Sequence, residues 1–166
     1  MIIGIVCVDK NWGIGKKNDL LFHLKKDMQF FRQQTSDSIV FCGYNTLLSF
    51  PGSKPLKGRS TICLCPEDVE REDCFCIHDF DKAVALVKEL AKTTNIYVIG
   101  GAMLYKSMLP YYDKVFVNKV DADGEAEVFF PCLDAYTEMD LDKVLPIVED
   151  EGYNTQLHIY TRVREV

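Results

Sequence analysis

Two kinds of hydrophobic pattern alternate along the chain, one typical of strands and the other typical of helices. Short runs in which almost every residue is apolar predict buried strands, and apolar residues that recur every three or four positions predict amphipathic helices. We expect helices over residues 24–34, 45–50, 80–91 and 103–109. We expect strands over residues 2–9, 38–42, 60–65, 74–77, 96–100, 114–121 and 156–163, with a weaker strand over 143–148.

This order of elements predicts one α/β sheet. Several of the expected strands are near-continuous apolar runs, as a parallel sheet covered on both faces requires. The last two strands are joined by a polar connection over residues 149–154, which is typical of an antiparallel hairpin. We therefore predict a doubly wound, mostly parallel sheet of about eight strands, with four helices and an antiparallel C-terminal edge. No repeat or linker is evident, so residues 1–166 are expected to form a single domain.

Charge and length exclude some partners. The 166 residues include 19 lysines and arginines against 25 aspartates and glutamates, which gives a formal net charge of −6. This balance argues against nucleic acid as the main partner, because phosphate binding needs a basic face. The longest apolar run, residues 2–8, is too short to cross a bilayer and lacks the flanks of a signal peptide. We expect a cytoplasmic protein with no membrane partner.

Seven cysteines are an unusual number for a chain of this length. An odd count without a signal peptide indicates reduced thiols. Two C-x-C pairs, Cys63 with Cys65 and Cys74 with Cys76, lie in strand-like segments where residues i and i+2 share one face. We predict that they are small core side chains, and a metal or redox role stays open as the alternative. Zinc sites usually use wider spacing, and no metal site is predicted.

Asp27 is the first candidate for chemistry. Leu24, Met28 and Phe31 recur at helical spacing and predict a core-facing stripe, and Asp27 borders it. A carboxylate at the edge of an apolar face is costly unless it has a partner. The alternative is an ordinary first-turn acid that the helix dipole stabilises.

Two strand–glycine–helix junctions are the second candidate, one at Gly43 and one at Gly100 and Gly101. Glycine permits close approach to the backbone, and free N–H groups at a helix start bind phosphate. Simple turn chemistry is the alternative. Arg59 is the third candidate, because arginine binds carboxylates and phosphates through two parallel hydrogen bonds. A solvated surface arginine is the alternative there.

Five motifs occur in order along the whole chain: VDKNWGIGKKNDLLFHLKKDMQFF, GYNT, PLKGR, VIGGAMLYKSMLP and DADGEAEVFFP. In this order and spacing they resemble the dihydrofolate reductase family. The resemblance implies a dihydrofolate-reductase-like fold and the reduction of 7,8-dihydrofolate to tetrahydrofolate with NADPH. It implies three catalytic residues, Asp27, Leu20 and Tyr105. Asp27 would accept hydrogen bonds from the pterin, a water beside Leu20 would carry a proton to N5, and residues 10–24 would form a lid.

The resemblance also implies which residues bind dihydrofolate. Arg59 would hold the α-carboxylate of the glutamate tail, and backbone carbonyls of Ile3 and Ile99 would face the pterin. The full expected set is Ile3, Ile5, Asp27, Met28, Phe31, Phe50, Leu56, Arg59, Ile99 and Asn118.

The cofactor-binding residues follow from the same resemblance. Thr46 and the junction from Gly100 to Tyr105 would cradle the diphosphate, and the family has a cis peptide bond between the two glycines. The full expected set is Ile5, Ile14, Gly15, Asp19, Leu20, Gly43, Tyr44, Asn45, Thr46, Leu64, Cys65, Pro66, Ile99, Gly100, Gly101, Ala102, Met103, Leu104 and Tyr105.

The sequence departs from the family's pattern where the 2′-phosphate of NADPH would lie. The family commonly has basic or hydroxyl side chains at positions held here by Tyr44, Cys65, Pro66 and Met103. Acidic side chains follow at residues 67 and 68, and an acid suits a free 2′-hydroxyl better than a phosphate. We therefore expect NADPH as the donor with a weakened preference, so that NADH use is possible.

Two further departures lie on the substrate side. The family usually has Pro and often Trp where Leu21 and Phe22 stand, and the lost indole N–H is a donor that would hold water. Asn118 stands where the family usually has Thr, next to the pterin amino group and Asp27. We expect these changes to alter water structure and antifolate contacts more than the activity itself.

Two other functions are compatible with part of this pattern. The pyrimidine reductase of riboflavin synthesis shares the fold, but it has no need of Asp27 or of the arginine in PLKGR. A dinucleotide-binding protein without catalysis is the other alternative. In either case the partner is a small molecule, and we expect a monomer.

Overall fold

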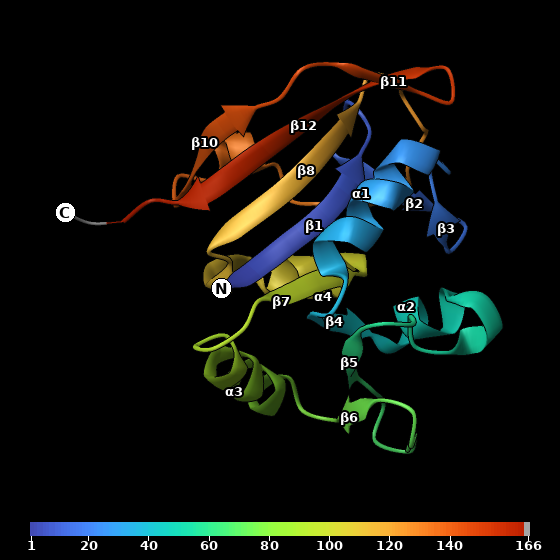
Figure 1. Cartoon of the computed structure of the whole chain (residues 1–166), viewed down its shortest axis with the longest axis vertical. Helices are drawn as coiled ribbons and strands as arrows, with labels where there is room; N and C mark the ends of the chain where they lie inside the picture. The colour runs from blue at the N-terminus through green and yellow to red at the C-terminus, as the bar shows by residue number, and fades with distance from the viewer. Residues whose placement is uncertain (165–166) are drawn as a thin grey trace.

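The computed structural model describes residues 1–164, and the main sheet in this part of the chain has nine strands (Figure 1). Eight of them follow the order β10-β12-β8-β1-β7-β4-β5-β6, and β11 pairs with the first three residues of β12. Their bounds are β1 Ile2–Val8, β4 Ile39–Gly43, β5 Ser60–Leu64, β6 Phe75–Ile77, β7 Ile96–Gly100, β8 Lys114–Val120, β10 Met139–Val144, β11 Val148–Asp150 and β12 Tyr153–Arg162.

The sheet is parallel from β8 through β1, β7, β4 and β5 to β6. The last strand, β12, runs antiparallel to β8, β10 and β11. The predicted mostly parallel sheet with an antiparallel C-terminal edge is therefore confirmed. A parallel sheet gathers the carboxyl ends of its strands along one edge, which is where ligands bind in such folds.

Helices cover both faces of the sheet, as a doubly wound fold requires. Their bounds are α1 Lys25–Thr35, α2 Tyr44–Ser49, α3 Phe80–Leu90 and α4 Ala102–Ser107, so all four predicted helices are confirmed to within three residues. Alternate residues of β1 serve the two faces: Val6 packs in the larger core with α3 and α4, whereas Ile3 and Ile5 face α1. Figure 1 shows α1 lying across β1.

The segment over residues 10–24, the predicted lid, contains two short strands that the hydrophobic pattern did not predict. They are β2 (Gly13–Lys16) and β3 (Asp19–Leu20), which form a second, three-stranded sheet with β9 (Val128–Phe129). The pairing of β2 with β9 joins residues more than a hundred positions apart, so no local pattern reports it.

The C-terminal edge also differs from the expectation in detail. The single weak strand predicted over residues 143–148 was wrong: β10 ends at Val144, β11 begins at Val148, and three residues connect them. Both pair with β12, which starts three residues earlier than expected. These strands are solvated on most positions, so their pattern of apolar residues is weak.

The two C-x-C pairs lie in or against the core, as their pattern predicted. Cys42, Cys63 and Cys65 are buried in one cluster, against which Cys74 and Cys76 pack. All seven cysteines are free thiols. Among residues 1–164, no group of three or more His, Cys, Asp or Glu side chains has the arrangement of a metal site. None of the helices described combines the length and apolar character needed to cross a lipid bilayer.

Phe41, in the middle of β4, is fully buried and lies opposite Val98 and Ile62 of the neighbouring strands. Phe41→Ala should lower the free energy of unfolding by about 3–5 kcal/mol, because it leaves a cavity in a close-packed core. Urea unfolding measures this change. Phe75→Ala is the matched control: its ring is 60% exposed, and the expected loss is below about 1 kcal/mol. Equal losses for the two variants would refute the assignment of the core.

Candidate active site

Asp27 lies in the first turn of α1, half-buried over the ends of β1 and β8. Its Oδ1 accepts a hydrogen bond of 2.9 Å from the side-chain amide of Asn118. Asn118 is opposite Cys7 in the pairing of β8 with β1, so both strands contribute to the surroundings of the carboxylate. The structure thus brings the two predicted residues Asp27 and Asn118 into direct contact.

The surroundings of Asp27 favour its protonated form. Burial raises the pKa of the carboxyl group, the Asn118 amide lowers it, and the negative charge of Asp150 raises it again. A carboxylate accepts bonds at two oxygens, and a single donor is described for its side chain. Such a group can bind a ligand that offers two parallel N–H donors.

An apolar surface lies beside Asp27. Ile3 and Ile5 of β1 form a cluster with buried side chains of β4 and β7, and aromatic rings of α1 and β8 pack against it. Four predicted substrate residues, Ile3, Ile5, Phe31 and Ile99, meet in this cluster. This surface suits one face of a flat ring system, because apolar and aromatic side chains bury such rings at little desolvation cost.

The other predicted substrate residues lie around this surface. Met28 is on the exposed side of α1, with 44% of its surface accessible, so the predicted core-facing stripe of Leu24, Met28 and Phe31 was wrong at this position. Phe50 packs on the cluster of Cys42 and Leu47 behind α2, and Leu56 is half-buried before β5. Met28 thus belongs to α1, and Phe50 and Leu56 belong to the segment between α2 and β5.

Arg59 is held firmly at the far end of α1. Its Nε donates to the Thr35 hydroxyl at 2.8 Å, and its Nη1 donates to the Lys57 carbonyl at 2.7 Å. The guanidinium lies 5.7 Å from the centre of the Phe31 ring. Burial and the nearby Arg32 both lower its pKa, so an anion bound here would relieve the repulsion between two cations.

Arg32 is a residue that our sequence prediction missed. It lies one helical turn after Met28 and one turn before Thr35, on the part of α1 that approaches Arg59. Arg32 is four residues after Met28, so the two lie on the same face of the helix, and this spacing could have identified Arg32.

The two predicted glycine junctions come together at the ends of β4 and β7. Cys42 is opposite Gly100 in the strand pairing, so the junctions are neighbours. A Cβ atom built on Gly100 or Gly101 would lie 3.4 Å from the Thr46 hydroxyl oxygen, at the limit of ordinary contact, and the φ of +127° at Gly100 is one that residues with side chains rarely adopt. The peptide bond between the two glycines is cis, as the resemblance implied.

Both junctions leave backbone donors free. Gly43 is the N-cap of α2 and Gly101 is the N-cap of α4, and neither helix start has a side-chain cap. Uncapped N–H groups need acceptors, and phosphate oxygens are suitable ones. Asn45 is exposed and Ala102 half-buried in the first turns of these helices. Leu104 is buried, whereas Met103 has 85% of its surface exposed.

Tyr105 has a different position from the other residues of its junction. Its phenol is buried and donates a hydrogen bond of 2.8 Å to the carbonyl of Ile5. Tyr112 donates in turn to the carbonyl of Tyr105 at 2.9 Å. Burial first, and then the charge of Asp27, raise the pKa of Tyr105, which keeps the phenol protonated. It therefore fixes the backbone of β1 under the apolar surface.

The predicted lid is the small hairpin of β2 and β3. Gly15 pairs with Leu20, and the Asp19 carboxylate accepts from the backbone N–H of Leu20 at 2.7 Å. Leu20 has 59% of its surface exposed. Ile14, in contrast, packs against the main core. The lid thus has a buried base and an exposed tip.

Asp9 holds the base of this hairpin, and it was not among the predicted site residues. It is 1% exposed and accepts from the backbone N–H groups of Asn11 at 2.8 Å, Gly13 at 2.7 Å and Gly124 at 3.0 Å. The polar loop over residues 121–127 is therefore tied to the lid. An acid directly after a buried strand is the signal that could have marked it.

The remaining predicted cofactor residues lie one strand further along the sheet. Leu64 ends β5, Cys65 is buried and Pro66 is exposed. Tyr44, in the first turn of α2, packs on the same cysteine cluster. Arg71, from the polar loop that follows Pro66, donates two hydrogen bonds to Asp73, of 2.9 and 2.7 Å.

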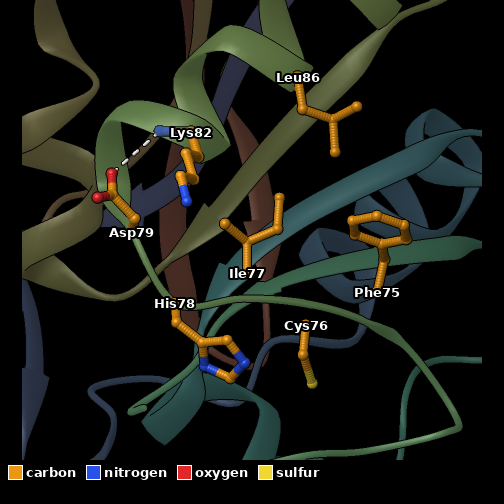
Figure 2. Close-up of a pocket in the computed structure, with 7 residues that line it drawn as sticks. All are labelled: Phe75, Cys76, Ile77, His78, Asp79, Lys82 and Leu86. Carbon is orange, nitrogen blue, oxygen red and sulfur yellow. Dashed lines mark hydrogen bonds between the residues drawn. The ribbon is translucent and has the colours of Figure 1, made fainter.

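A cavity of about 410 Å³ lies outside these residues, at the β6 edge of the sheet. Figure 2 shows its lining by Phe75, Cys76 and Ile77 of β6, by His78 and Asp79, and by Lys82 and Leu86 of α3. None of the predicted site residues lines it. The two ring nitrogens of His78 hydrogen-bond with the Pro66 carbonyl and the Glu70 carboxylate. The Asp79 carboxylate caps α3 by accepting from the backbone N–H of Lys82.

A family model described as dihydrofolate reductase matches residues 1–162. The chain belongs to the dihydrofolate reductase family. It is 31% identical to the dihydrofolate reductase of Haemophilus influenzae over 159 residues, which cover 95% of this chain and 96% of the relative. It is 31% identical to that of Enterococcus faecium over 163 residues, which cover 96% and 92%.

A solved structure gives the same assignment. Dihydrofolate reductase from Enterococcus faecalis, complexed with NADP(H) and RAB-propyl, is similar with a TM-score of 0.85 and 26% identity, covering 98% of this chain and 96% of the other. The family inferred from the five motifs is confirmed, and with it an enzyme that reduces dihydrofolate with a nicotinamide dinucleotide. The pyrimidine reductase and the non-catalytic alternative are not favoured.

Removing the guanidinium of Arg59 should weaken dihydrofolate binding. Arg59→Ala should raise the KM for dihydrofolate by about 10- to 100-fold, with a smaller effect on kcat, since a hydrogen bond to a charged group contributes about 1.5–3 kcal/mol. Steady-state kinetics measure both constants. Lys57→Ala, which removes the same charge from an exposed neighbour, should leave KM within about twofold. An unchanged KM in Arg59→Ala would exclude Arg59 from the substrate site.

Proposed function

We propose that Asp27 binds the pterin ring of dihydrofolate through its 2-amino group and the adjacent ring nitrogen. The observation that carries this proposal is the Asp27 carboxyl group itself, held by Asn118 at the border of the apolar cluster of Ile3 and Ile5. Two parallel N–H donors match the two oxygens of a carboxylate. The tail of the substrate then runs along α1 toward Arg59, which binds its α-carboxylate.

The residues at the two glycine junctions fit a nicotinamide dinucleotide. The open backbone at Gly100 and Gly101, the Thr46 hydroxyl and the uncapped starts of α2 and α4 suit the diphosphate. When bound, the reduced nicotinamide supplies the hydride for C6 of the pterin. The backbone of Ile5, fixed by Tyr105, and the lid residues Ile14 to Leu20 would enclose this end of the site.

Asp27 also promotes the transfer of the proton that must reach N5 of the pterin. Burial and the nearby Asp150 raise its pKa, and in its ionised form the carboxylate stabilises a positively charged ring next to it. The exposed position of Leu20 at the tip of the lid is compatible with a water that enters beside it and carries the proton. Asp27 in this proposal acts through its charge, and the lid excludes bulk water.

Spectrophotometric assay of NADPH oxidation, with and without dihydrofolate, tests the activity of the folded protein. Asp27→Asn should lower kcat by about 100-fold or more at neutral pH, because the ring then lacks a compensating charge. The rate of the variant should recover in part at low pH, where the substrate arrives already protonated. A wild type and a variant with the same flat pH profile would contradict the role of Asp27.

We propose NADPH as the physiological donor, with a weaker preference over NADH than a site rich in basic residues would give. Tyr44, Cys65, Pro66 and Met103 bring no positive charge to the adenosine end. Arg71 is close to this end, but its guanidinium is already neutralised by Asp73 and bonded to the carbonyl of Ser53.

The ratio of kcat/KM for NADPH to that for NADH, measured at fixed ionic strength, should be below about a hundredfold, which corresponds to about 2.7 kcal/mol. A larger ratio would show that the 2′-phosphate has a strong partner in this protein. The comparison is then repeated with Asp73→Asn, which removes the carboxylate that pairs with Arg71. If this pairing keeps Arg71 from binding the 2′-phosphate, the ratio should increase in the variant.

We further propose that the chain acts as a single domain and a monomer in the cytoplasm. The free thiols and the charge of −6 support a reducing compartment and a dispersed protein.

A further inference from the structure

The helix that carries Asp27 begins without a cap from its own sequence. The N-cap of α1 is Leu24, whose side chain makes no capping hydrogen bond. The first N–H groups of a helix have no partners within the helix, and leaving them unpaired destabilises it. The groups at the start of α1 therefore need an acceptor from elsewhere.

Asp150, at the end of β11, supplies that acceptor. Its Oδ1 accepts from the backbone N–H of Lys26 at 3.2 Å, and its Oδ2 accepts from the backbone N–H of Asp27 at 3.0 Å. The side chain is 2% exposed, and 123 residues separate it from Asp27. Both oxygens of one carboxylate thus hold the first turn of α1.

Further contacts fix the β11–β12 turn on the start of α1. The Lys26 ammonium donates to the carbonyl of Glu149 at 2.6 Å. The rings of Phe22 and Tyr153 meet edge to face with centroids 5.0 Å apart. The turn is therefore docked on the helix start by polar and apolar contacts, and Asp150 is the buried part of that contact.

We propose that Asp150 is a positioning residue for the reaction: it anchors the first turn of α1 so that Asp27 points into the substrate cleft, and its charge acts on the carboxyl group of Asp27. The proposal rests on the function proposed for Asp27. It assigns a catalytic consequence to a residue of the C-terminal hairpin, whose carboxylate accepts hydrogen bonds from the backbone of Lys26 and Asp27.

The groups that face Asp27 come from four elements. From β8, Asn118 donates a neutral amide, and from β1 the Cys7 thiol lies nearby. From α4, the Tyr105 phenol is close enough to sense the charge of Asp27. Burial raises the pKa of both the thiol and the phenol, so neither adds a negative charge at neutral pH.

Asp150 is thus the anionic group among these neighbours, and it raises the pKa of Asp27 after burial, the larger cause. The Lys25 and Lys26 ammonium groups point to Glu151 and to the Glu149 carbonyl. Two carboxylates that share the start of one helix repel each other, which favours the protonated form of the one that faces the cleft.

The test is the titration of the Asp27 carboxyl carbon by ¹³C NMR in the free enzyme, assigned by its loss in Asp27→Asn, together with the pH profile of kcat/KM. Asp150→Asn keeps one acceptor for the helix and removes the charge. We expect its Asp27 titration and the matching inflection of the rate profile to move to lower pH. Asn118→Ala should move both to higher pH, because it removes the donor that lowers the pKa.

Glu149→Gln removes one negative charge from the adjacent exposed residue and should leave the titration of Asp27 unchanged. A folded Asp150→Asn with the wild-type titration overturns the proposal. If Asp150→Asn does not fold, Asp150→Ser, which retains a short capping oxygen, is read by the same titration and the same criterion.

The outcome is separable from the function proposed for Asp27. Full activity in Asp27→Asn would refute that function, whatever Asp150→Asn does. An inactive Asp27→Asn combined with an unshifted titration in Asp150→Asn would refute the proposal for Asp150 and leave the function of Asp27 standing.

Discussion

The placement of one half-buried carboxyl group organises this molecule. A carboxylate beside an apolar surface is unfavourable unless other groups hold it, and Asp27 is held by parts of the chain that are far apart. Helix α1 carries it, β8 donates the Asn118 amide, and β11 anchors its backbone through Asp150. These partners fix the position of the carboxyl group, but they leave part of its capacity to accept hydrogen bonds unused. A ligand with two parallel N–H groups can fill it.

The order of the strands places the parts of the site in a line. Asp27 lies over the ends of β1 and β8, the glycine junctions lie at the ends of β7 and β4, and Leu64 ends β5, with Pro66 following it. In the binding mode that we propose, a dinucleotide extends along this edge with its diphosphate at the junctions. Its two ends would then lie beside Asp27 and beside β5. The same edge would therefore hold both the reacting ring and the 2′-phosphate.

Much of the fold could be predicted from local patterns, because burial on both faces gives strands a continuous apolar run. The stripe of Leu24, Met28 and Phe31 located α1, and an acid at its border marked Asp27. The pairing of β9 with β2 could not be predicted in this way, since it joins residues over a hundred positions apart. The same limit hid the contacts of Asp150 with α1 and of Asp9 with Gly124, whereas the other partners of Asp9, Asn11 and Gly13, are close to it in the sequence. Arg32 could have been found from its helical spacing.

The decisive measurement is a crystal structure of the ternary complex with folate and NADP⁺. We predict that both oxygens of Asp27 accept hydrogen bonds from the pterin ring, while Arg59 binds the α-carboxylate and the diphosphate lies between Thr46 and Gly101. A pterin ring bound away from Asp27, with that carboxyl group still paired only with Asn118, would contradict this prediction.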